Sequence, residues 1–217
     1  KARIFLYGDY DVDGMTSVSL FITVLRHLGA NLKFHIPHRF TEGYGLNMAI
    51  MDEVIYSKST LLITLDCGIS NEKELRYLKE KSNVNVIILD HHTIPEVLPP
   101  AEVIINPRAL DKKHPFQELC TAGIAYKFLD YFVTTYKHDL DMSQFSDLAA
   151  LGTVADIVPL IGENRAITMQ GLKIMEKRKN KGLNALLEMS NFKKTTVSSR
   201  DLGFVIAPRL NAPGRLT

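Results

Sequence analysis

Short apolar runs and amphipathic segments alternate along the first half of the chain. The apolar runs predict buried strands at residues 4–7, 32–36, 61–65, 86–89 and 103–105. Between them, apolar residues recur every three or four positions, which predicts helices at 14–29, 47–56 and 71–81. Strands that alternate with helices indicate an α/β fold, with a parallel five-stranded sheet flanked by helices.

The pattern changes after about residue 121. Four further segments have helical periodicity, at 122–136, 145–154, 165–177 and 183–189, and no further strand is predicted. Residues 199–206 also have helical character. We therefore expect the sheet to be followed by a helical C-terminal portion.

Acidic side chains follow three of the predicted strands at the point where each strand ends. They are Asp9, Asp11 and Asp13 after the first strand, Asp66 after the third, and Asp90 with His91 and His92 after the fourth. The carboxyl ends of parallel strands meet at one edge of a sheet, so we expect these groups to lie together there. Bare carboxylates would repel one another, and bound divalent cations would convert that repulsion into coordination.

This set of ligands favours particular metals and a particular reaction. Carboxylates with one or two imidazoles and no thiolate suit Mn²⁺ or Mg²⁺, while Zn²⁺ stays open. Two ions about 3.5–4 Å apart would form a clamp for in-line attack on a phosphorus centre. A single Asp after a strand is usually a helix cap or turn former, so the prediction depends on the whole set. A calcium loop beginning at Asp9 is excluded, because its twelfth position holds Leu20 instead of Glu.

Composition adds little about the substrate and more about the location. The net charge of +2 argues neither for nor against a polyanionic substrate. The two cysteines, Cys67 and Cys120, form no disulfide framework and favour a reducing compartment. Neither a signal peptide nor an apolar stretch of membrane-spanning length is present, so we expect a cytoplasmic protein with no membrane partner.

Six ordered motifs resemble those of a known family. GDYDVDG at 8–14, LDCG at 65–68, DHH at 90–92 and GTVADIVPL at 152–160 resemble the four motifs of the DHH phosphoesterase superfamily. PHRFTEGYG at 37–45 and PRLNAPGR at 208–215 resemble its RecJ-like branch of single-strand-specific exonucleases. DHH alone is a weak signal, whereas six motifs in order are specific. The resemblance implies hydrolysis of single-stranded DNA from 5′ to 3′, with release of mononucleotides, in DNA repair and recombination.

The resemblance also implies which residues hold two Mn²⁺ or Mg²⁺ ions. One ion would bind Asp11 and Asp66, with Asp9 as a further ligand or a group behind the ligands. The other ion would bind Asp13, Asp66, His91 and Asp156, so that Asp66 bridges the pair.

Other residues would act on the substrate. His92 would orient or polarise the scissile phosphate, which makes His92 and Asp66 the expected catalytic residues. Arg39, with Arg209 or Arg215, would hold phosphate, because a planar guanidinium suits that task. Tyr44 would stack on a base or shape the nucleotide path. Single-stranded DNA is the expected partner, and a single-strand-binding protein or a helicase are the expected protein partners.

The chain departs from the family pattern in two places. Many members have a histidine where Tyr7 stands, and a Tyr7 side chain directed into the sheet would leave the first ion without that nitrogen ligand. Relatives also carry a second domain that helps to bind substrate. We therefore expect residues 1–195 to form the DHH catalytic domain and residues 196–217 to begin the connection to that second, DHHA1-like domain.

Two other functions stay open at this point. A nano-RNase, a cyclic-dinucleotide phosphodiesterase or an inorganic pyrophosphatase would share the metal ligands but not the segments at 37–45 and 208–215. A non-catalytic nucleic-acid-binding replication partner would use the same fold, but such a protein is expected to have lost at least one acidic ligand, and all are present here.

Overall fold

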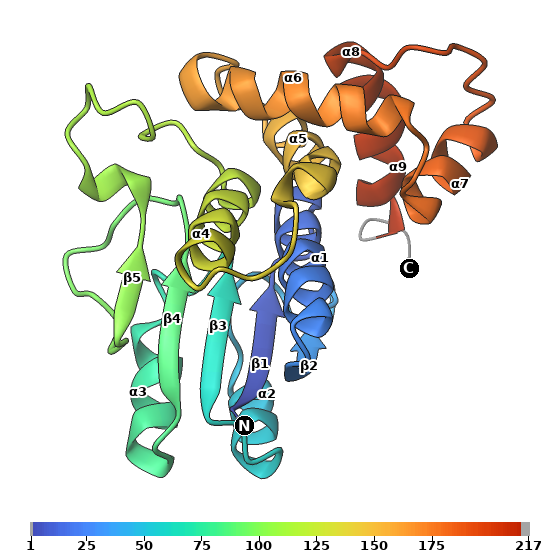
Figure 1. Cartoon of the computed structure of the whole chain (residues 1–217). Coiled ribbons are helices and arrows are strands. Elements are labelled where there is room, and N and C mark those ends of the chain that lie inside the picture. The colour runs from blue at the N-terminus through green and yellow to red at the C-terminus, as the bar shows by residue number, and fades with distance from the viewer. Residues whose placement is uncertain (1, 214–217) are drawn as a thin grey trace.

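A parallel five-stranded sheet forms the centre of the molecule. The structure is a computed structural model that describes residues 2–213. The strands are β1 (Arg3–Gly8), β2 (Asn31–His35), β3 (Leu61–Leu65), β4 (Asn85–Leu89) and β5 (Val103–Ile105). They pair in the order β2-β1-β3-β4-β5 (Figure 1). Every predicted strand is confirmed.

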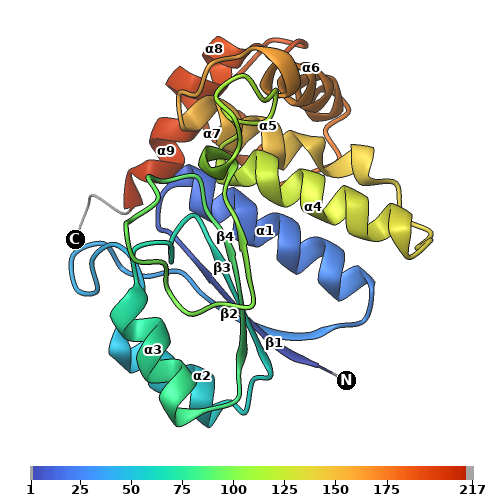
Figure 2. The ribbon, with the colours of Figure 1, turned by 90° about the vertical axis from the view of Figure 1, so that its left-hand side faces the viewer.

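Helices cover both faces of the sheet. The four that do so are α1 (Val12–His27), α2 (Met48–Tyr56), α3 (Glu72–Lys81) and α4 (Thr121–Thr135). Successive strand residues point to opposite faces, so Leu6 packs in the apolar cluster with α1 and α4, whereas Phe5 packs in the one with α2 and α3. Figure 2 shows the two layers on either side of the strands.

The later helices stack beyond the carboxyl ends of the strands (Figure 1). They are α5 (Ser146–Ala155), α6 (Gly162–Glu176), α7 (Lys181–Met189), α8 (Ser199–Asp201), the π-helical η3 (Leu202–Ile206) and α9 (Ala207–Asn211). Short 3-10 turns, η1 (Pro107–Ala109) and η2 (Met142–Phe145), precede α4 and α5. Leu202 and Ile206 are buried in one cluster with Leu151 of α5 and Val12 of α1. The predicted helical C-terminal portion is therefore confirmed, and it packs directly on α1.

The register of the sheet brings three acidic residues level at its edge. Gly8 pairs with Leu65, and Leu65 pairs with Leu89. The ladder continues one residue further, because the amides of Asp9, Asp66 and Asp90 donate to the neighbouring strands at 3.2, 3.0 and 3.1 Å. The strand order reverses between β1 and β3, which is the position where open α/β sheets bind ligands.

The N-terminus of α1 differs from the prediction for a local reason. The helix begins at Val12 rather than at residue 14, because the Asp11 carboxylate accepts a hydrogen bond from the Gly14 amide at 3.0 Å and caps it. Asp13 therefore lies in the first turn of the helix.

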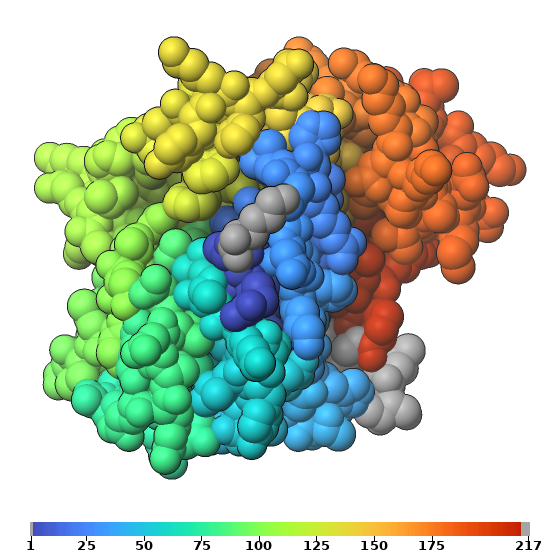
Figure 3. All heavy atoms as spheres, turned by 60° about the horizontal axis from the view of Figure 1, so that its bottom comes forward, coloured from blue at the N-terminus to red at the C-terminus, as the bar shows by residue number. Residues whose placement is uncertain are grey.

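The amino ends of the strands lie at the end of the molecule opposite the acidic residues. Figure 3 brings this end forward and shows atoms of α1, α2, α3 and α4 crowded around the start of the sheet. Among residues 2–213, no helix combines the length and the apolar character needed to span a bilayer.

Candidate metal centre

The acidic residues predicted from the strand ends converge at the β1/β3 edge. Asp9 follows β1, Asp66 follows β3, Asp13 comes from α1, and all three are buried. Asp156 is the C-cap of α5 and reaches the cluster from the helical portion. Ligand atoms of Asp9, Asp11 and Asp66 lie within 4.8 Å of one another, as do those of Asp13, His91 and Asp156.

His91 lies among three of these carboxylates. Its Nε2 is 3.4 Å from Asp66 Oδ1, 3.6 Å from Asp156 Oδ2 and 3.9 Å from Asp13 Oδ2. Burial lowers the pKa of His91 to about 4, and the neighbouring His92 adds to the effect. The imidazole is therefore neutral at pH 7, which is the form that binds metal ions.

The ionised forms of these carboxylates are destabilised, and bound cations would stabilise them. Burial, together with the charges of nearby carboxylates, raises the pKa of Asp9 and of Asp156 to about 7. Burial and the charge of Asp13 raise the pKa of Asp66 well above its usual range. Asp9 Oδ1 is buried and accepts no hydrogen bond within the described residues. Divalent cations fit this donor set, because they would neutralise the charges and supply Asp9 with a partner.

His92 is held in a different way. Its Nδ1 lies 2.8 Å from Asp90 Oδ1 and 3.2 Å from the Tyr44 hydroxyl. The bond to Asp90 raises the pKa of His92, and Asp90 is itself fixed by the amides of His92 and Ile69. Nδ1 is therefore engaged, and Nε2 is the nitrogen left for a substrate. Ligand atoms of His92, Asp66 and His91 also lie within 4.8 Å of one another.

Several supporting residues were not predicted from the sequence. Asn106 donates to the carbonyl of His92 at 2.9 Å, and Arg108 donates to that of His91 at 2.7 Å. Thr121 donates from its hydroxyl to Asp66 Oδ1 at 2.9 Å. Only Asn106 has a signal in the sequence, because it directly follows β5 at the same edge as the acidic residues.

Of the described arginines predicted to bind phosphate, Arg39 lines the cavity at the acidic cluster and Arg209 does not. Arg39 lines a cavity of about 430 Å³ above the acidic cluster, and its guanidinium lies 5.3 Å from the centre of the Tyr10 ring. Arg209 lies on α9 and donates to the carbonyl of Val205 at 2.7 Å, and it does not line that cavity. Arg215 lies outside the described residues. Tyr44 lines the same cavity as Arg39 and is half-exposed.

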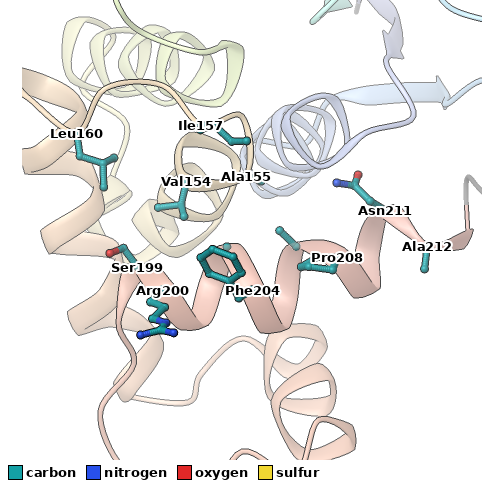
Figure 4. Close-up of a pocket in the computed structure, with 12 residues that line it drawn as sticks. Val154, Ala155, Ile157, Leu160, Ser199, Arg200, Phe204, Pro208, Asn211 and Ala212 are labelled. Carbon is teal, nitrogen blue, oxygen red and sulfur yellow. The ribbon is translucent and has the colours of Figure 1, made fainter.

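An apolar groove adjoins this cavity. It has a volume of about 830 Å³ and runs between the end of α5 and the α8–α9 segment, with Val154, Ile157, Phe204 and Pro208 among its walls (Figure 4). Ala155, Ile157 and Asn211 line both spaces, so the groove and the acidic cavity lie side by side. Arg200 is the charged residue among the described lining residues of the groove.

Tyr7 anchors the loop that carries Arg39 and Tyr44. Its side chain is fully buried on the α2 and α3 face of the sheet, and its hydroxyl donates to the carbonyl of Gly45 at 2.8 Å. Asn71 holds the next residue of the loop by accepting from the amide of Leu46 at 3.2 Å. The tyrosine at this position thus directs its hydroxyl to the 37–47 loop and fixes it there.

Comparison with known proteins assigns the fold and the motifs to one family of proteins. The family described as DHH family, N-terminal domain, matches residues 3–153. The single-stranded-DNA-specific exonuclease RecJ of Haemophilus influenzae is 39% identical over 226 residues, which cover 100% of this chain and 39% of that protein. RecJ of Bacillus subtilis is 38% identical over 216 residues and is covered to 27%. The chain thus spans less than half the length of these relatives.

Solved structures agree with this similarity. A crystal structure of exonuclease RecJ bound to manganese has a TM-score of 0.87 and 38% identity, covering 98% of this chain and 53% of that one. RecJ from Thermus thermophilus in complex with Mn²⁺ has a TM-score of 0.83 and 35% identity, covering 98% of this chain and 30% of that one. The predicted fold class is confirmed.

Replacing Tyr7 by Phe tests its role as the anchor of the 37–47 loop. Tyr7→Phe leaves the buried carbonyl of Gly45 without a donor, and we expect it to lower the free energy of unfolding by about 1–3 kcal/mol. Limited proteolysis of the loop should become faster. The control is Tyr131→Phe, because Tyr131 is 71% exposed. Equal stability of the two variants in chemical denaturation would contradict the anchoring role.

Proposed function

Because the chain belongs to the DHH family, we propose that its acidic cluster is the catalytic centre of a metal-dependent phosphoesterase that hydrolyses single-stranded DNA. The observation that carries the proposal is the convergence of carboxylates from β1, β3, α1 and α5 around His91 at the sheet edge. The proposed substrate is based on the names of the RecJ relatives, and the proposed ions, Mn²⁺ or Mg²⁺, on the metals in their crystal structures.

Two groups of residues would hold two ions. Asp9, Asp11 and Asp66 form one group, and Asp13, His91 and Asp156 form the other, with Asp66 within reach of both. When bound, the ions supply a water of lowered pKa as nucleophile and neutralise the charge that develops on the phosphoryl oxygens. The protein's own contribution is to hold the carboxylates in a buried pocket at fixed positions.

The remaining polar residues act on the substrate. His92, with its Nδ1 held by Asp90, presents Nε2 to the scissile phosphate. Arg39 stands at the cavity and contacts a phosphate oxygen of the bound nucleotide. Tyr44 positions His92 through its hydroxyl and leaves its ring half-exposed toward the nucleotide.

The strand leaves the acidic cavity along the apolar groove. The groove lies beside the cavity, and Phe204 and Ile157 in its wall would contact the faces of bases. Its described lining residues include a cation, Arg200, and no acid. Single-stranded nucleic acid suits such a surface, because unpaired bases stack on apolar side chains while phosphates contact cations.

Several expectations stay predictions. Digestion from the 5′ end, cytoplasmic localisation, a single-strand-binding protein or helicase as partner, and phosphate binding by Arg209 rest on the sequence motifs or composition. We also propose that residues 196–217 lead to a further domain. The described part of this segment packs on the first domain through Val197 and Leu202.

The proposed function is tested by digestion assays with Mn²⁺ and Asp66→Ala. The substrates are a 5′-labelled single strand, a duplex, a dinucleotide and pyrophosphate. We expect single-strand digestion that falls at least about 100-fold in Asp66→Ala, because both ions would lose a shared ligand. The control is Asp139→Ala, an exposed carboxylate in the turn after α4.

Other outcomes of this assay would replace the proposal. Turnover of only the dinucleotide or pyrophosphate would assign the chain to the small-substrate enzymes, and strand binding without turnover would indicate a non-catalytic partner. Turnover of Asp66→Ala above about a hundredth of the wild-type rate would contradict the bridging role.

A salt titration tests the contact between Arg39 and phosphate. Arg39→Ala should weaken single-strand binding and reduce the slope of log affinity against log salt by about 0.7, the value for one lost contact to a single strand. Arg26→Ala is the matched control, because Arg26 is an exposed arginine in the last turn of α1, at the opposite end of the sheet. An unchanged slope would remove Arg39 from the phosphate path.

Substrates of different length test the strand path. Phe204 is 78% exposed in the groove, and stacking on one aromatic ring contributes about 1–3 kcal/mol per base. Phe204→Ala should therefore raise KM about tenfold for a 12-nucleotide strand and leave KM for a dinucleotide unchanged. Tyr56→Ala, at an 81% exposed aromatic residue ending α2, should change neither value. Equal effects of Phe204→Ala on both substrates would exclude the groove as the path.

A further inference from the structure

The first turn of α4 contacts two carboxylates of the acidic cluster. The amides of Thr121 and Ala122 donate to the two oxygens of Asp13, each at 2.8 Å, and the Thr121 hydroxyl donates to Asp66 Oδ1 at 2.9 Å. All three hydrogen bonds are buried. They join a helix of the second half of the chain to the ends of β1 and β3.

Asp13 takes the place of a local helix cap. The N-cap residue of α4 is Cys120, and its side chain makes no capping hydrogen bond to the first turn. A helix N-terminus normally receives such a bond from a Ser, Thr, Asp or Asn at this position. Here the amides are satisfied by a carboxylate 108 residues away in sequence, so the start of α4 and Asp13 fix each other.

Helix α5 packs closely against the first turn of α4 and against Asp13. A Cβ atom on Gly152 would lie 2.4 Å from the Cβ of Ala122 and 3.0 Å from Asp13 Oδ1. No side chain fits between the two helices at this point. The first turn of α4 is therefore confined between α5 and the carboxylate of Asp13.

From this geometry we infer that Thr121 is a positioning residue of the metal centre. Its amide sets the carboxylate of Asp13 and its hydroxyl sets that of Asp66, so two ligands assigned to the bound ions are oriented before an ion arrives. The inference rests on the proposed metal-dependent function. Residues that orient metal ligands from behind typically change metal affinity 10- to 100-fold when they are replaced.

The test measures the affinity of the whole chain for Mn²⁺. Electron paramagnetic resonance detects the Mn²⁺ that remains unbound in a titration. Thr121→Val keeps the shape and removes the hydroxyl, so it should raise the Kd of Mn²⁺ about 10- to 100-fold. Thr121→Ser keeps the hydroxyl and should stay within about threefold of wild type. Gly152→Ala, which displaces the turn without touching Thr121, should also raise the Kd.

Thr168→Val is the matched control. Thr168 is a buried threonine of α6 whose hydroxyl has no hydrogen-bond partner within the described residues, so its replacement should leave the Kd unchanged. If Thr121→Val does not fold by circular dichroism, Thr121→Ala, which also lacks the hydroxyl, replaces it.

The outcomes separate this inference from the proposed function. Wild-type affinity in a folded Thr121→Val variant would overturn the positioning role and leave the metal centre intact. An equal loss in Thr121→Ser and Thr121→Val would show that packing rather than the hydroxyl matters, and would also overturn it. Absence of Mn²⁺ binding by the wild-type chain would overturn both this inference and the proposed function.

Discussion

The burial of several carboxylates in one cluster is the constraint around which this molecule is built. Asp9, Asp13 and Asp66 are almost fully buried within one cluster, where loss of hydration and, after it, charges of the same sign raise the free energy of the folded state. The fold tolerates the cluster because backbone amides and the Thr121 hydroxyl donate to two of its members. These hydrogen bonds leave part of the energetic cost uncompensated, and bound divalent cations would remove that part. The cost to folding and the proposed function therefore have the same origin.

The parallel sheet makes this concentration of charge possible. In-register ends of β1, β3 and β4 place Asp9, Asp66 and Asp90 side by side, and each has its own amide in the ladder. Asp90 differs from the other two in its neighbours. Burial opposes ionisation, but hydrogen bonds from His92 outweigh it and lower the pKa of Asp90. One row of equivalent backbone positions thus yields two proposed metal ligands and one residue that forms a hydrogen bond with a histidine.

Local signals in the sequence predicted the strands and the acidic residues, and they did not predict what surrounds those residues. The strands at 61–65 and 103–105 match β3 and β5 because polar residues bound short apolar runs. The helix predicted from residue 122 excluded Thr121, whose bonds to Asp13 and Asp66 span 108 and 55 residues and leave no periodic pattern. Continuation of the last helix past residue 206 was also missed. Proline interrupts most helices, but here Pro208 stands in the first turn of α9, directly after a π-helical segment.

The backbone conformation of Asp66 supports the functional interpretation independently of charge. Asp66 and Ile157 both adopt left-handed backbone conformations, with φ of 67° and 61°. Other residues with positive φ, such as Lys58 and Lys137, directly follow the C-caps of α2 and α4, where this conformation is common. Ile157 occupies the same position, because it follows Asp156, the C-cap of α5, although the conformation costs a β-branched residue about 1–2 kcal/mol. Asp66 follows a strand instead. Ile157 is also 88% exposed, so burial does not repay the cost. Asp66 has no such helix end to explain its conformation, and its carboxylate lies within 4.8 Å of ligand atoms of Asp9 and Asp11. Strain kept at Asp66 is expected where the geometry of the ligands, rather than stability, determines the backbone.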